Sequence, residues 1–168
     1  MKKATITIHK EAVLADIDAL TFKRADGVLS AESEQLKNAL SSDSEEGLDS
    51  HILHEMMETR DARVRKKLAF CLEADNEDLN VSNLLEMDQP AFEYKVSVPD
   101  NMDKQRLRIV AKNIHNYMVQ GVLYDWYATQ NMKGNVGPSE LEDMENAVVY
   151  MLRPSTVKRP LQPFGPQH

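Results

Sequence analysis

The sequence predicts a mainly α-helical fold with a minor β element (α+β): about four to five helices, two short strands and an extended tail. Only 6 of the 168 residues are glycine, and residues that favour helices are common. Apolar residues recur at helical spacing along much of the chain, whereas the segments 4–8 and 91–98 alternate apolar and polar residues. A chain of this length can bury a hydrophobic core without disulfides or metals.

The N-terminal segment predicts a strand that leads directly into a helix. Residues 4–8 alternate apolar residues with threonines, as in a half-buried strand. From Lys10 the apolar residues take helical spacing, at Val13, Ile17 and Leu20. A second short helix is expected over 31–40, with Ser30 as its N-cap, and residues 41–47 then form a polar loop.

A longer helix is expected over 48–72, because its apolar residues form one stripe: Leu53, Met57, Val64, Leu68 and Cys71. The second strand, 91–98, lies between Pro90 and Pro99. The main helix is expected over 103–131, before a segment with two glycines and a proline. The last helix begins near Ser139, whose spacing to Glu142 fits a capping box, and it stops at Pro154. Its predicted buried stripe is Leu141, Met144, Val148 and Met151.

Residues 153–168 differ from the predicted domain, 1–152. They contain four of the seven prolines, three basic residues and no acidic residue, which predicts an extended basic tail. Acidic charge concentrates elsewhere: 26–61 holds 10 Asp and Glu against 2 Lys and Arg. We expect the tail to reach a neighbouring subunit, with Leu161 and Phe164 in an apolar groove and its basic groups near an acidic surface; a disordered terminus is the alternative.

The segment 117–127 has eight apolar or aromatic residues among eleven, so it must be covered on most sides. The cover is either the chain's own core or a neighbouring subunit. Gly121 would let another backbone approach closely in either case. Asp125 is expected to act as a hydrogen-bond partner of a buried tyrosine or tryptophan, and Trp126 is expected to be buried.

No nucleotide-binding or hydrolase motif occurs in the sequence. The best metal candidate, His51, His54, Glu55 and Glu58, has neither of the zinc-protease spacings, and we expect no metal and no cofactor. Cys71 lies on an apolar stripe, which favours an inert buried thiol over a catalytic one. His115 is interpreted as a packed or half-exposed residue, and the basic run 60–67 as a largely solvated face that could instead bind phosphate or acidic residues.

The net charge of −7 argues against general nucleic-acid binding. No apolar run has the length of a signal or membrane segment, and the single cysteine fits a reducing compartment. These features predict a cytoplasmic protein.

The segment 92–131, about a quarter of the chain, resembles small prophage-encoded proteins of Bacteroidetes of the head–tail junction type, the connector or completion proteins. The resemblance rests on Val98–Asn101, on His115 with Tyr117, and on Leu123–Trp126. It implies a mainly helical protein that assembles as a ring at the portal end of a capsid and is incorporated into a phage particle, and it implies no active site.

We therefore expect a non-catalytic assembly or interaction subunit that binds itself or another assembly protein. The candidate interaction residues are Tyr117, Gly121, Tyr124, Trp126, Leu161 and Phe164. Two alternatives remain open from the sequence. One is a small enzyme that depends on a metal or a thiol, and the other is a regulatory binding module that uses the acidic loop.

Overall fold

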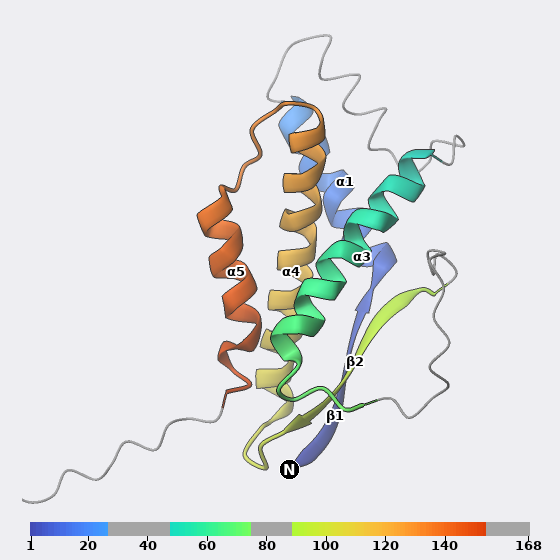
Figure 1. Ribbon diagram of the computed structural model, residues 1–168. Helices are drawn as coiled ribbons and strands as arrows, with labels where there is room; N and C mark the ends of the chain where they lie inside the picture. Colours follow the sequence, from blue (N-terminus) through green and yellow to red (C-terminus); the bar gives the residue numbers. More distant parts are fainter. Residues whose placement is uncertain (27–47, 75–88, 154–168) are drawn as a thin grey trace, which may run out of the picture.

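A computed structural model describes residues 1–26, 48–74 and 89–153, in which four helices pack with a two-stranded antiparallel sheet (Figure 1). The elements are β1 (Lys2–His9), α1 (Lys10–Asp26), α3 (Leu48–Leu68), β2 (Ala91–Val98), α4 (Lys104–Thr129) and α5 (Pro138–Tyr150). The predicted fold class is confirmed. The predicted helix 31–40, the loop 41–47 and the tail beyond Arg153 lie outside the described residues.

The two strands pair with each other, as their matching alternation predicts. Ile6 faces Tyr94 and Ile8 faces Phe92, and all four side chains are buried. The chain that follows α3 adds one bridge at the other edge of β2, where Ser97 N donates to the Cys71 carbonyl at 2.8 Å and Glu73 N donates to the Lys95 carbonyl at 2.9 Å. Two strands alone are marginal in water. Here α1, α3 and α4 all contact the sheet, and their packing stabilises it.

The helix predicted over 48–72 ends at Leu68. The amides of Cys71 and Leu72 both donate to the Leu68 carbonyl at 2.9 Å, and the chain then turns to join β2. The stripe predicted for this segment is buried at every position, including Cys71 beyond the end of α3. The main helix, α4, begins after Asp103, whose carboxylate caps it by accepting from Arg106 N at 2.8 Å.

The capping box predicted at Ser139 is wrong. The N-cap of α5 is Gly137, which offers no side-chain hydrogen bond, and Pro138 takes the first helical position. Proline suits that position because its fixed φ is helical and its missing N–H would have no partner there. Ser139 therefore lies inside the helix. The predicted stripe of α5 is confirmed at Leu141 and Val148, while Met144 and Met151 are only partly buried.

Helix α4 is central: α5, α3, α1 and β1 all contact it. Within 117–127 only Gln120, Tyr124 and Asp125 are not buried, and the chain's own elements provide the cover. Trp126 is 4% exposed, as predicted. No helix among the described residues combines the length and apolar character that a membrane span requires.

Candidate functional site

A buried guanidinium lies at the junction of α3, α4 and α5. Arg60 of α3 is 4% exposed, and its Nε and Nη2 donate to the two carboxylate oxygens of Asp125 on α4, at 3.0 and 2.5 Å. This is a two-pronged ion pair, which fixes the orientation of both groups. It joins residues 65 positions apart in the chain.

Tyr117 extends this contact to α5. Its hydroxyl accepts from Arg60 Nη1 at 3.3 Å and donates to Glu145 Oε2 at 3.0 Å. Glu145 also lies 3.6 Å from Arg63 Nη1 and 3.6 Å from Lys67 Nζ. We call Arg60, Tyr117, Asp125 and Glu145 the Arg60 network. It connects three helices through side chains that are buried or half-buried.

Gly121 makes room for this network. A Cβ at this position would lie 2.6 Å from Arg60 Cδ and 2.7 Å from Arg60 Nε, which is too close for a real contact. The group that approaches Gly121 is therefore a side chain, where the sequence predicted another backbone. The prediction for Asp125 also needs correction, because its carboxylate accepts from Arg60 and not from a tyrosine or tryptophan.

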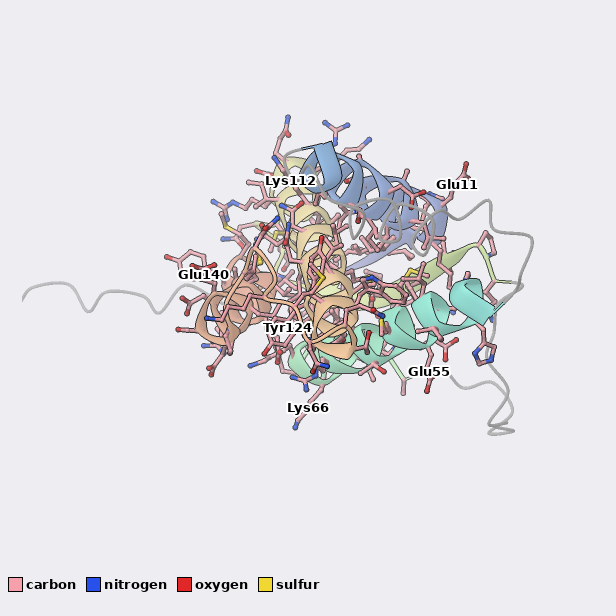
Figure 2. The ribbon with its side chains drawn as sticks, turned by 90° about the horizontal axis from the view of Figure 1, so that it is seen from above. Glu11, Glu55, Lys66, Lys112, Tyr124 and Glu140 are labelled. Atoms are coloured by element: carbon pink, nitrogen blue, oxygen red, sulfur yellow. The ribbon has the colours of Figure 1, made fainter. Side chains whose placement is uncertain are left out.

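A cavity of about 380 Å³ opens beside the network, between α3, α4 and α5. Its walls include three basic groups (Arg60, Arg63, Lys67) and three acidic groups (Asp125, Glu142, Glu145), together with Tyr124. The charges balance, and Asp125 and Glu145 already hold the three basic groups. Figure 2 shows Tyr124 on α4 at the side that faces α5. The arrangement connects α3, α4 and α5 and so stabilises their packing.

Hydrogen bonding and burial shift the pKa values of the network. Burial lowers the pKa of Arg60, but the hydrogen bonds to Asp125 and Tyr117 raise it by more, so the guanidinium stays charged. Burial raises the pKa of Tyr117, and the Glu145 carboxylate raises it further against the opposing effect of Arg60. Burial also raises the pKa of Tyr94, and Asp61, which accepts from its hydroxyl at 2.6 Å, adds to the increase.

These tyrosines predict alkaline unfolding. Both folded-state pKa values are raised, so ionisation favours the unfolded chain, and stability that is present below about pH 10 is lost as pH rises above it. For Tyr94, whose pKa is raised the more strongly, the cost should reach about 1.4 kcal/mol by pH 11. Absorbance at 295 nm should show Tyr94 ionising only as the protein unfolds. Tyr94→Phe should reduce the loss, whereas a wild-type titration of all tyrosines below the unfolding transition would contradict the prediction.

The residues of the metal candidate, His51, His54, Glu55 and Glu58, do not converge. His51 and Glu55 are exposed, while His54 and Glu58 are half-buried. In the described residues, no three or more His, Cys, Asp or Glu side chains are grouped as a metal ion requires.

The Cys71 thiol is buried and donates to the Leu68 carbonyl at 3.3 Å. Burial raises the pKa of this thiol, which disfavours the reactive thiolate. His115 is half-buried, and its Nε2 lies 2.7 Å from Asp16 Oδ2, which links α4 to α1. Both residues therefore take the structural role that the sequence favoured.

The basic run 60–67 is mostly paired with carboxylates. Arg65 binds Asp61 at 2.7 Å, and Arg60, Arg63 and Lys67 bind carboxylates of α4 and α5. Sequence reasoning assigned Arg60 to a solvated face and missed its burial. The signal was its spacing, three residues after Met57 and four before Val64, which places it on the apolar stripe.

The candidate interaction residues separate into three groups. Tyr117, Gly121 and Trp126 are buried by the chain itself, and Tyr124 is half-buried at the cavity. Leu161 and Phe164 lie outside the described residues.

Three exposed apolar side chains belong to the end of the molecule where α3 and α5 end and α4 begins. Phe70 (55% exposed) follows α3, Ile109 (43%) belongs to the first half of α4, and Tyr150 (76%) ends α5. Lys67 Nζ donates to Asn146 Oδ1 at 2.9 Å and Asn113 Nδ2 donates to the Ala147 carbonyl at 3.2 Å, so the other two helices flank the last turns of α5. Figure 1 shows these helix ends at the lower end of the molecule. We call Phe70, Ile109 and Tyr150 the apolar rim.

Comparisons with protein-family models, with curated protein sequences and with solved structures gave no match to this chain.

Proposed function

We propose that this chain is a non-catalytic assembly subunit that binds copies of itself through the end of the molecule that carries the apolar rim. The observation that carries the proposal is the exposure of three large apolar side chains at the end of the molecule where α3 and α5 end and α4 begins. Single exposed apolar residues are common, but several at one end of a fold are typical of a protein contact. Aromatic residues such as Phe70 and Tyr150 are favoured anchors of such contacts.

The contacts of the ionisable side chains support a role in protein assembly rather than in catalysis. Buried or half-buried ionisable groups are engaged in contacts between elements, as in Arg60 with Asp125, Tyr94 with Asp61 and His115 with Asp16. An active site instead presents a nucleophile or base toward an open space. The resemblance of 92–131 to head–tail junction proteins, together with the mainly helical fold, favours a connector or completion protein of phage origin as the form of this assembly.

The test is the molar mass of the protein as a function of concentration, measured by sedimentation equilibrium. The wild-type mass is expected to rise above the monomer value. The double variant Phe70→Ser/Tyr150→Ser should weaken self-association by about tenfold or more. Its thermal midpoint should change little because both side chains are exposed.

Glu55→Ser is the matched control, since Glu55 is exposed on α3 away from the rim and its loss should leave the mass unchanged. A wild-type protein that stays monomeric at every concentration would overturn the proposal. Stoichiometric zinc or iron that is lost in His51→Ala/His54→Ala would favour the metal-dependent enzyme instead.

A further inference from the structure

The outward face of α5 is acidic and ends in an aromatic residue. Leu141 and Val148 point into the core, while Glu140, Asp143 and Tyr150 are exposed. The thirteen residues of α5 include four acidic residues and no basic one. Figure 2 shows Glu140 pointing away from the body of the molecule.

The outer carboxylates of α5 are unpaired within the described residues. Glu140 and Asp143 make no hydrogen bond or ion pair there, whereas Glu145 of the same helix binds Tyr117, Arg63 and Lys67. Like charges close together on one helix repel each other. A basic partner would relieve this repulsion.

The chain contains a segment of matching chemistry. Residues 154–168 carry Lys158 and Arg159 and no acidic residue, and Leu161 and Phe164 follow them. Four prolines in this segment fix φ, so ordering it on a surface loses less entropy than ordering a flexible chain would.

The spacing of the two segments also matches. Glu140 and Tyr150 lie ten positions apart on a helix, which is about 15 Å at 1.5 Å per residue. Arg159 and Phe164 lie five positions apart, which is about 15 Å in an extended proline-rich chain. An arginine on the acidic part of α5 would therefore place a phenylalanine on Tyr150.

The order of the groups favours a second copy over the chain's own helix. Acidic groups precede the aromatic residue in α5, and basic groups precede Phe164 in the tail. The basic groups of the tail can face the acidic groups of α5 while Phe164 faces Tyr150 only when the tail and the helix run in the same direction. A tail that leaves the C-terminal end of its own α5 would run back along the helix in the opposite direction.

We propose that residues 154–168 of one copy dock along the outer face of α5 in another copy, with Lys158 and Arg159 against Glu140 and Asp143, and Phe164 on Tyr150. This inference rests on the proposed self-assembly and names one of its contacts. It also explains why Tyr150 is exposed at the end of a helix whose outer carboxylates have no partner in the described residues.

A charge exchange in the full chain tests the contact. Glu140→Lys/Asp143→Lys and, separately, Lys158→Glu/Arg159→Glu should each raise the dissociation constant of self-association by about tenfold. The chain that carries all four substitutions should return to within about threefold of the wild-type value. Sedimentation velocity at low salt provides the measurement, and the wild-type dissociation constant should rise as salt is added.

The control is Glu11→Lys/Glu55→Lys, which makes the same change in net charge on α1 and α3. Figure 2 shows these two residues on the side of the molecule opposite to Glu140. Weakening by this control equal to that of the α5 variant would overturn the inference, because only net charge would matter. Self-association that persists unchanged in both reversed variants would overturn the inference and leave the proposed assembly intact. A monomeric wild type would overturn both.

Discussion

Asp125→Ala is expected to lower the free energy of unfolding by about 3 kcal/mol, the lower end of the range for breaking a buried ion pair. Arg60 is 4% exposed, and the substitution removes the carboxylate that its guanidinium binds by two hydrogen bonds. Asp125 is itself 28% exposed, so water can reach the vacated position and reduce the cost. Urea unfolding followed by circular dichroism gives the measurement.

The double variant Arg60→Met/Asp125→Leu is the control for this prediction. It removes both charges and keeps apolar bulk between α3 and α4, so it should be less destabilised than Asp125→Ala. A double variant as unstable as the single one would show that shape, and not an unpaired charge, dominates the loss.

Because Gly121 contacts the stem of Arg60, Gly121→Ala should also be tolerated better in the Arg60→Met background.

Local periodicity was enough to predict the elements that position these residues. The strands show a period of two and the helices a helical spacing, and both patterns arise because one face of each element must be apolar. The same reasoning placed Trp126 in the core, since its neighbours in 117–127 leave little polar surface. The start of α5 was predicted two residues away from the observed N-cap, because Ser139 and Pro138 give competing signals.

The partners of polar groups could not be predicted in this way. Arg60 and Asp125 meet only because α3 and α4 pack together, and nothing local to either residue identifies the other. The basic run indicated a solvated face because five basic residues occur within eight positions. Tertiary packing instead turned Arg60 inward and placed Arg63 and Lys67 beside Glu145 of α5, while Arg65 pairs with Asp61 of its own helix.

The candidate site shows a similar limit. The sequence left open whether the chain's own core or a neighbouring subunit covers 117–127, and the fold uses most of that segment for its own core. The proposed contact surface consists of Ile109 on α4, Tyr150 on α5 and Phe70 in the turn after α3, and no local sequence pattern identifies it. Only the packing of α3 and α4 beside α5 brings Phe70, Ile109 and Tyr150 to the same end of the molecule.

Trp126→Ala should have the largest effect on the core, with a loss of about 3–5 kcal/mol in the free energy of unfolding. The side chain is 4% exposed on the central helix, and its removal leaves a cavity that the surrounding helices can fill only in part. The loss should appear as a lower urea midpoint with an unchanged slope.

Trp126→Phe separates the volume of the side chain from its polar group. The indole Nε1 is buried and has no hydrogen-bond partner in the described residues, so removing it breaks no bond to them. Phenylalanine restores part of the apolar volume, and the variant should therefore be clearly more stable than Trp126→Ala. If the two variants were equally unstable, a hydrogen bond of Nε1 would account for the loss.

Because Trp126 is the only tryptophan, native emission reports on this site alone. Burial predicts a blue-shifted emission that added quenchers hardly reduce, and a red-shifted, readily quenched emission would contradict the position of Trp126 in the core.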